Sequence, residues 1–243
     1  MFIQIDGIDG AGKSTLISAA EDWARGKDLK IFDVTEWSRT RGSAPDLNDI
    51  GNVDVLLTSE PTHAGIGAVI RNEIIKRETP YSARFAAESF ALDRGVQYTR
   101  LILPFLANRA KRLVIQDRGL LSSLAYQPLQ SEKENIAGAE PVTIDWLLTL
   151  EGNKIALSNH PDIFIFLDID PKIAADRLAG RTEKIDAHVY EHQAFQARLA
   201  ERFRDPKVCE PLVERGTQII TLDGSKTKEE LKTEMLKILN QTF

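Results

Sequence analysis

Two patterns of hydrophobic positions alternate along the chain. Short continuous apolar runs have the length of strands that are buried on both faces, and longer stretches repeat their apolar residues every three or four positions, as helices covering a sheet do. We predict strands at residues 2–5, 30–35, 53–58, 112–116, 163–168 and 218–222. We predict helices at residues 14–25, 66–76, 81–108, 144–158, 172–180, about 190–203 and 228–239.

Strands that alternate with helices are typical of an α/β fold with a central parallel sheet. Three stretches depart from this rhythm. Residues 38–52 have no clear period, and we interpret them as a surface loop or insertion; residues 132–141 are polar and loop-like, and residues 181–189 interrupt the apolar period. Pro104 is expected to kink or end the long helix. Because we find no internal repeat and no linker, we predict one domain over residues 1–243.

Composition and charge exclude several classes of partner and site. The net charge of −5 argues against a nonspecific nucleic-acid binder, although an anionic small molecule needs only a local positive field. The single cysteine, Cys209, excludes an intrachain disulfide and a cysteine-based zinc cluster. No apolar run reaches the ~18 residues of a membrane span, and no signal peptide is recognisable. We therefore expect a cytoplasmic protein with no nucleic-acid or membrane partner.

One motif points directly to a nucleotide. Residues 7–14 read Gly-Ile-Asp-Gly-Ala-Gly-Lys-Ser, the pattern of a phosphate-binding loop, between a predicted strand and a predicted helix. In this pattern the glycines let backbone N–H groups surround phosphates, the lysine adds a positive charge, and the serine hydroxyl is placed for Mg²⁺. We predict that ATP binds at Gly7, Asp9, Gly10, Ala11, Gly12, Lys13, Ser14 and Thr15.

Four segments identify a branch of the P-loop proteins. They lie at residues 6–15, at 88–94 (Glu-Ser-Phe-Ala-Leu-Asp-Arg), at 114–127 (with Asp-Arg-Gly and Ser-Ser-Leu-Ala-Tyr-Gln) and at 161–181. In this order and spacing they resemble the motifs of thymidylate kinases. The resemblance implies a three-layer α/β/α P-loop fold with a central parallel sheet, a mobile lid at 181–190, and a homodimer. It also implies Mg²⁺-dependent transfer of the ATP γ-phosphate to dTMP, giving dTDP and ADP.

The charged residues support that reaction independently of the resemblance. Phosphoryl transfer brings two anions together, so several cations must converge on the site from different segments. The candidate cations are Lys13, Arg94, Arg118, Arg177 and Arg181.

By resemblance, the acceptor dTMP lies against the second and third segments. Phe90 would stack on thymine, Arg94 would bind the base edge one helical turn later, and Arg118 would clamp the monophosphate as an arginine fork. Ser123 would lie near the base and Tyr126 near the sugar. The full set of acceptor residues is Asp9, Glu60, Phe90, Arg94, Arg118, Ser122, Ser123, Tyr126 and Gln127. Asp117 is a candidate for the Mg²⁺ shell with Ser14, the alternative being an ion pair with a neighbouring arginine.

The catalytic set is predicted to be Lys13, Asp9, Arg177 and Arg181. Ala11 stands where some thymidylate kinases carry an arginine beside the γ-phosphate, so the resemblance implies that the lid supplies this cation. Arg177 and Arg181 are four residues apart and share one face if the helix continues. Lys184 is the reserve candidate.

Several positions depart from the family pattern and leave alternatives open. The family's Arg-Glu-Pro, whose arginine contacts the acceptor phosphate, is Ser59-Glu60-Pro61 here, and Arg71 or Arg84 is a candidate replacement. The Asp-Arg-Tyr tyrosine is Gly119. A kinase of the same fold for another deoxynucleotide or a nucleoside is therefore the first alternative. A P-loop switch protein without turnover is the second, although a switch has no need of a phosphate clamp.

Overall fold

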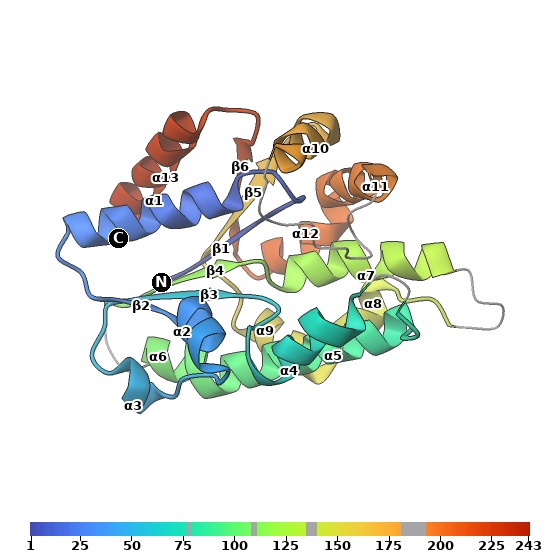
Figure 1. Cartoon of the computed structure of the whole chain (residues 1–243), viewed down its shortest axis with the longest axis horizontal. Coiled ribbons are helices and arrows are strands. Elements are labelled where there is room, and N and C mark those ends of the chain that lie inside the picture. The colour runs from blue at the N-terminus through green and yellow to red at the C-terminus, as the bar shows by residue number, and fades with distance from the viewer. Residues whose placement is uncertain (77–78, 108–110, 135–139, 181–192) are drawn as a thin grey trace.

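The computed structural model describes residues 1–76, 79–107, 111–134, 140–180 and 193–243 (Figure 1). Six strands form a single sheet in the order β2-β3-β4-β1-β5-β6, and every neighbouring pair is parallel. The strands are β1 (Phe2–Gly7), β2 (Ile31–Asp33), β3 (Val55–Ser59), β4 (Leu113–Asp117), β5 (Ile163–Asp168) and β6 (Gln218–Asp223). All six predicted strands are therefore confirmed, and with them the α/β class with a parallel sheet.

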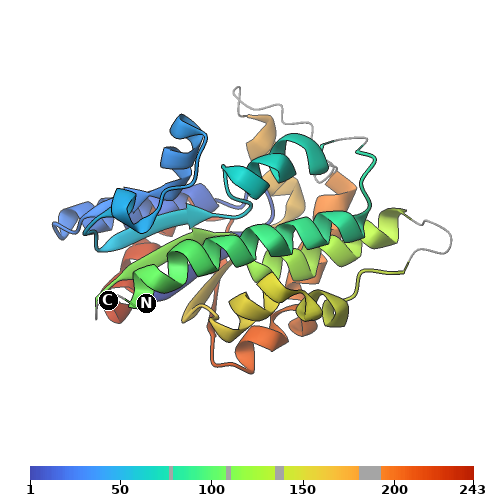
Figure 2. The ribbon, with the colours of Figure 1, turned by 90° about the horizontal axis from the view of Figure 1, so that it is seen from below.

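Helices cover both faces of the sheet. They are α1 (Lys13–Gly26), α2 (Val34–Arg41), α3 (Leu47–Ile50), α4 (Gly65–Val69), α5 (Ala83–Gln97), α6 (Leu103–Ala107), α7 (Leu120–Glu134), α8 (Ile144–Thr149), α9 (Glu151–Ser158), α10 (Pro171–Ala179), α11 (Gln193–Arg204), α12 (Pro206–Val213) and α13 (Lys228–Thr242). Two wide π-helical turns, η1 (Ile70–Ile74) and η2 (Tyr98–Ile102), extend α4 and α5. Helices α1 and α13 lie on one face of the sheet, and α5, α6 and α9 lie on the other (Figures 1 and 2).

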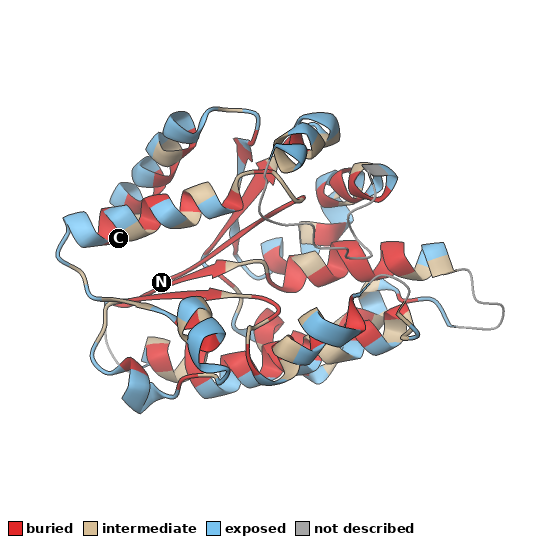
Figure 3. Cartoon of the chain, in the orientation of Figure 1, coloured by how far each residue is buried: buried red, intermediate tan, exposed pale blue. Residues whose placement is uncertain are grey.

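The order of the strands places the P-loop and the end of β4 side by side at the carboxyl end of the sheet. Strand β1 is buried along its whole length and lies between β4 and β5, with Ile5 opposite Asp117 and Gly7 opposite Leu167. The four inner strands β1, β3, β4 and β5 are the most continuously buried part of the molecule, and the outer faces of the helices carry many exposed residues (Figure 3). Because parallel strands end at a common edge, the P-loop after β1 lies beside the residue that ends β4.

The prediction of a loop at residues 38–52 was wrong for residues 38–41 and 47–50, which are helical. Helix α2 runs through Arg41 and a short α3 follows. Both are stabilised by side chains that satisfy free backbone N–H groups at a helix start: Asp33 accepts from the Glu36 N–H, and Asp46 forms a reciprocal cap with Asp49. The same Asp33 cap ends β2 early. Asp46 lies in the stretch that we predicted as a loop and Asp33 in a predicted strand, and both are helix caps.

Other helix boundaries also differ from the prediction. The expected helix at 144–158 is divided at Leu150, whose ψ of 136° is extended. The long helix does not end at Pro104, which lies in α6; the wide turn η2 ends two residues before this proline, which has no N–H to donate. The pattern did not predict α7 or α12, each of which contains an internal proline, Pro128 and Pro211. No helix in the described ranges is long and apolar enough to cross a membrane.

Candidate active site

The loop between β1 and α1 has the backbone that a phosphate-binding loop requires. Gly10 and Gly12 have φ angles of 84° and 109°, a region that favours glycine. A Cβ at Gly10 would lie 2.4 Å from the Ala174 carbonyl oxygen, so α10 packs directly against this loop. Ala11 is buried beneath the loop. Helix α1 begins at Lys13, and Ser14 and Thr15 follow in its first turn, with Ser14 exposed.

The Lys13 ammonium is folded back over the same loop. Its Nζ donates to the carbonyl oxygens of Gly7 (2.9 Å) and Ile8 (3.0 Å), and lies 3.7 Å from an Asp9 carboxylate oxygen. Burial lowers the pKa of Lys13, and the positive charge of Arg118 lowers it further. The loop thus holds a desolvated cation beside the predicted phosphate position.

Arg118 connects the end of β4 to the P-loop. Its Nη2 donates to Asp9, its Nη1 donates to the Tyr126 hydroxyl (2.9 Å), and Asp6 lies 3.6 Å away. Burial disfavours the charged form, but the surrounding Tyr126, Asp9, Asp6 and Asp117 outweigh it and raise the pKa of Arg118. Arg118 also has a φ of 66°, an uncommon conformation for a side chain of this size. Such strain concentrates at functional sites.

Asp6 completes this cluster, although we did not predict it as a site residue. It is fully buried and accepts hydrogen bonds from the Gly7 N–H (2.8 Å) and from the Ser122 hydroxyl (2.6 Å). Burial raises the pKa of Asp6. An acidic residue at the end of an otherwise apolar, buried strand was the available signal, because such a group rarely lies there without a partner.

A buried ion pair lies beneath the predicted base-binding region. Arg94 is 1% exposed and donates from Nε (2.9 Å) and Nη2 (2.6 Å) to one oxygen of Glu60. Its Nη2 also contacts the Ser123 hydroxyl (2.8 Å), and its Nη1 donates to Asn153. Gln116 donates to the other Glu60 oxygen (2.7 Å). Burial raises the pKa of Glu60, which the charge of Arg94 opposes.

The remaining predicted acceptor residues surround this pair. Phe90 is half-buried on α5, one turn before Arg94. Tyr126 packs against the rings of Phe195 and Phe203. Gln127 is 1% exposed, and its Oε1 accepts no hydrogen bond from the residues that the structure describes. A buried amide oxygen with no protein donor is open to a donor on a bound molecule.

Gln196, from α11, reaches the P-loop in a way that the sequence did not signal. Its Oε1 accepts from the Asp9 N–H and its Nε2 donates to an Asp9 carboxylate oxygen, both at 3.4 Å. The two residues are 187 positions apart in the chain. The helix that follows residues 181–192 therefore contacts the phosphate-binding loop.

The structure distinguishes between the two arginines proposed to replace the family arginine at Ser59. Arg71 donates to the carbonyl oxygens of Pro61 (3.0 Å) and Thr62 (3.2 Å), next to Glu60. Burial lowers the pKa of Arg71 to about 10, with Arg118 and Arg39 adding to the effect and Asp117 opposing it, so its charge lies near these groups. Arg84 instead pairs with Glu140 (2.8 Å) and covers the Trp146 ring.

Two of the predicted site residues fit a divalent cation. One oxygen of Asp117 is buried and accepts no hydrogen bond within the described ranges, and its charge is close enough to raise the pKa of Lys13. The described residues contain no cluster of three or more His, Cys, Asp or Glu side chains that would hold a metal alone. Mg²⁺ commonly takes only one or two protein oxygens and completes its shell with water and phosphate. Asp117 and Ser14 suit that role.

Arg177 is held close to the P-loop, but its donors are engaged. It donates to the carbonyl oxygens of Gly224 (2.6 Å), Ser225 (2.9 Å) and Lys226 (3.1 Å) in the loop after β6. A Cβ at Gly224 would lie 3.0 Å from the Ala11 carbonyl oxygen, so this loop borders the P-loop. Arg181, Lys184 and the predicted lid at 181–190 lie outside the described residues.

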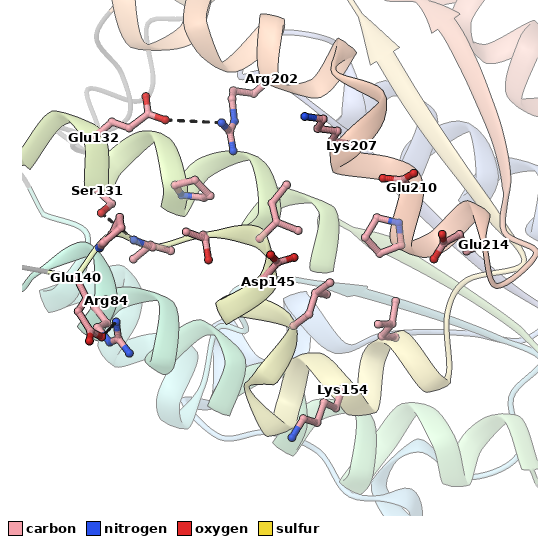
Figure 4. Close-up of a pocket in the computed structure, with 18 of the residues that line it drawn as sticks. Arg84, Ser131, Glu132, Glu140, Asp145, Lys154, Arg202, Lys207, Glu210 and Glu214 are labelled. Atoms are coloured by element: carbon pink, nitrogen blue, oxygen red, sulfur yellow. Dashed lines mark hydrogen bonds and ion pairs between the residues drawn. The ribbon is translucent and has the colours of Figure 1, made fainter.

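A separate large cavity lies away from the strand ends. It has a volume of about 1250 Å³ and is bordered by α7, α8, α9, α11 and α12 (Figure 4). Its lining mixes acidic and basic side chains, among them Asp145, Lys154, Lys207, Glu210 and Glu214. Of the residues considered for the site, Arg84 alone lines it, and none of the predicted ATP, dTMP, metal or catalytic residues does.

Comparisons with known proteins agree with the geometry at the strand ends. A family model described as thymidylate kinase matches residues 46–235. The chain is 32% identical over 224 residues to a probable thymidylate kinase of Thermococcus onnurineus, covering 87% of this chain and 90% of that protein. It is 31% identical to a probable thymidylate kinase of Thermococcus kodakarensis (95% and 100% covered). It is 30% identical to a thymidylate kinase of a Geobacillus species (95% and 91% covered).

Proposed function

The chain belongs to the thymidylate kinase family, and from that premise we propose which residues carry the transfer of a phosphoryl group from ATP to dTMP. It is a phosphotransferase with dTMP kinase activity. The observation that carries the assignment of roles is the contact between Arg118 and Asp9, because it joins the acceptor side of the site to the P-loop.

ATP binds with its phosphates along residues 7–15. The positive φ angles of Gly10 and Gly12 support this position, since they shape the loop before α1. Lys13 leaves the carbonyl oxygens of Gly7 and Ile8 for the outer phosphates, which are the stronger acceptors. The positive end of α1 adds to the attraction. Ser14 and Asp117 hold Mg²⁺, which, when bound, neutralises charge on the transferred group.

The acceptor phosphate lies between Arg118 and Arg71. Arg118 is supported in this role by its contacts with Asp9 and Tyr126, which fix a guanidinium at the carboxyl end of β4. Arg71 supplies the second cation in place of Ser59, and its contacts beside Glu60 and the lowering of its pKa by the nearby charge of Arg118 support this. Two fixed cations hold the acceptor oxygen in line with ATP, and such positioning provides most of the acceleration in phosphoryl transfer.

The nucleoside of dTMP lies against α5 and α7. Phe90 stacks on the thymine ring, and Arg94, Ser123 and Gln127 face its polar edge. The unpaired Oε1 of Gln127 suits the N–H donor of thymine. Tyr126 and Asp9 approach the sugar. Ser122 and Glu60 support the site indirectly: Ser122 donates a hydrogen bond to Asp6, and Glu60 accepts one from Arg94.

The catalytic cation beside the γ-phosphate comes from the segment after α10. Ala11 carries no charge, and the three carbonyl contacts of Arg177 favour Arg181 for this role. Arg177 instead fixes the loop after β6 against the P-loop. Lys184 remains the reserve candidate, and a cytoplasmic location remains the expectation.

We also propose that two copies associate through α5. Phe85, Leu92 and Val96 are 46%, 58% and 44% exposed and recur at i, i+7 and i+11, so they form one apolar stripe. In a two-fold dimer the stripe of one copy would pack against the same stripe of the other copy, because both subunits use the same surface. The opposite side of α5 packs against α9 and α7.

One assay tests the acceptor. The purified protein is mixed with ATP, Mg²⁺ and, in turn, dTMP, dUMP, other deoxynucleoside monophosphates and thymidine, and ADP release is measured. We expect turnover on dTMP well above the rest. Ser59 motivates the alternative of another acceptor, which a higher rate elsewhere in the panel would establish. ATP binding without any turnover would contradict both kinase assignments.

A further inference from the structure

We propose that Asn153 is a positioning residue for base recognition and acts through Arg94. The inference rests on the proposed role of Arg94 at the base edge. Asn153 lies outside the sequence segments that identified the family, 59 residues after Arg94 in the chain.

The contacts of Asn153 are made entirely inside the protein. It is 0% exposed on α9; its Oδ1 accepts from Arg94 Nη1, and its Nδ2 donates to the Leu147 carbonyl oxygen (2.8 Å). The Leu147 carbonyl oxygen can only accept a hydrogen bond, so the NH₂ end of the amide faces Leu147. The oxygen end therefore faces Arg94, where it accepts from Nη1. The amide oxygen of Asn153 is thus held in a fixed direction as a hydrogen-bond acceptor for Arg94.

Two glycines bring this amide within reach of Arg94. A Cβ at Gly152 would lie 1.7 Å from the Ala91 carbonyl oxygen, and a Cβ at Gly95 would lie 3.1 Å from the Gly152 Cα. Helices α5 and α9 therefore meet backbone to backbone beside Asn153 and Arg94. Any side chain at Gly152 would push α9 away from α5.

The effect on Arg94 is to fix the plane of its guanidinium. Glu60 accepts from Nε and Nη2, and Asn153 accepts from Nη1 on the other side. One of the two Nη1 N–H groups then remains for a ligand, since Asn153 is the one acceptor of Nη1 among the residues that the structure describes. Without Asn153, the remaining partners Glu60, Ser123 and Gly119 would hold only the Nε and Nη2 side of the group, and the buried Nη1 donor would lose its partner.

The test separates recognition of the base from recognition of the phosphate. Calorimetric affinities are measured for dTMP and for 2-deoxyribose 5-phosphate, which has the same sugar and phosphate but no base. For Asn153→Ala we expect dTMP affinity to fall by about tenfold, the loss expected for one charge-assisted hydrogen bond. We expect the sugar phosphate affinity to stay within about twofold. Lys154→Ala is the matched control, since Lys154 is the next residue on α9 and faces the large cavity (Figure 4).

Two further variants decide whether Asn153 works through Arg94. Asn153→Ala added to Arg94→Ala should lower dTMP affinity no further, because the shared interaction is already lost. Asn153→Asp keeps an acceptor toward Arg94 but loses the Nδ2 donor to Leu147, so it should retain more dTMP affinity than Asn153→Ala. It also serves if the alanine variant does not fold. Equal losses for both ligands, or additive losses in the double variant, would show a general structural role and overturn the proposal.

Failure of the proposed function and failure of the role of Asn153 give different outcomes. If the unmodified protein fails to bind dTMP, the proposed function itself is wrong. If it binds dTMP and Arg94→Ala weakens that binding while Asn153→Ala does not, only the role of Asn153 is wrong.

Discussion

The Arg118 guanidinium contacts the Asp9 carboxylate although 109 residues separate the two in the chain. This contact joins the end of β4 to the P-loop, and Arg118 reaches it from a backbone with φ of 66°. The fold therefore accepts a strained residue at the point where donor and acceptor phosphates are expected to meet. The strain and the charge of Arg118 can be tested separately, because glycine removes both and alanine removes only the charge.

Arg118→Ala should abolish most acceptor phosphorylation while ATP still binds. Removing one cation from a phosphoryl-transfer site commonly costs about 100-fold or more in rate, so we expect kcat/KM for dTMP to fall by at least that factor. ATP affinity, measured by calorimetry, should change little. Arg198→Ala is the control, because Arg198 pairs with Glu132 on the surface. Loss of ATP binding would mean that Arg118 belongs to the donor side.

Arg118→Gly should be equally inactive but more stable than Arg118→Ala. Glycine adopts a φ of 66° without the steric cost that alanine incurs, which is about 1 kcal/mol. Both variants lose the same ion pairs, so the difference in their free energies of unfolding reports the backbone strain, less the extra conformational entropy that glycine gives the unfolded chain. Urea denaturation measures it. Equal stabilities would indicate that the backbone at this position relaxes on substitution.

Arg71 and Arg84 form a second matched pair. Arg71→Ala should raise the KM for dTMP by about tenfold or more, since a buried guanidinium near Arg118 would be lost from the phosphate site. Arg84→Ala should leave KM nearly unchanged, because Arg84 pairs with the exposed Glu140. Steady-state kinetics with dTMP as the varied substrate distinguishes them. The reverse order would place the missing family arginine at Arg84.

Features of the site that depend on neighbouring residues in the chain were predictable from the sequence, and contacts between distant segments were not. The strands and the P-loop were predictable because buried parallel strands and glycine-lined loops have local signatures. Asp46 misled the prediction, since aspartate favours both loops and helix caps, and Asp33 was placed inside a predicted strand although it caps the next helix. Gln196 and Asn153 had no local signal at all. Their roles depend on helices α11 and α9 packing against residues far away in the chain.

Asp6→Asn should gain stability relative to the unmodified protein as the pH rises. Burial raises the pKa of Asp6 above 3.8, so the folded protein holds this proton more tightly than the unfolded chain. The contribution of Asp6 is therefore most favourable below pH 3.8 and is lost as the pH rises through its folded pKa. Asparagine resembles the neutral form at every pH.

Unfolding free energies measured at a series of pH values upward from 3.8 provide the measurement for Asp6→Asn. We expect the variant to gain stability relative to the unmodified protein as the pH rises. We also expect it to lose activity, because Arg118 loses one of its carboxylate neighbours. Ser14→Ala is a useful control, since it alters the same site without a titrating group. A difference that is constant with pH would contradict the burial argument.

Asp117→Asn should raise the Mg²⁺ concentration needed for half-maximal turnover. The buried Asp117 oxygen has no hydrogen-bond partner among the described residues, and replacing a carboxylate by an amide weakens a hard-cation site. Chelation by EDTA should stop turnover of the unmodified protein, and added Mg²⁺ should restore it. Asp223→Asn is the control, as Asp223 is exposed and bonds Ser225. An unchanged Mg²⁺ requirement would assign Asp117 to an ion pair instead.

Leu92→Glu should convert the proposed dimer to a monomer. Leu92 is the most exposed member of the apolar stripe on α5, and a two-fold interface would place two introduced carboxylates close together in a desolvated contact. Light scattering should show the mass falling from about twice 27.2 kDa to 27.2 kDa. Val213→Glu, at a site of similar exposure on α12, should leave the mass unchanged. A monomeric unmodified protein, or a dimer that survives Leu92→Glu, would remove α5 as the interface.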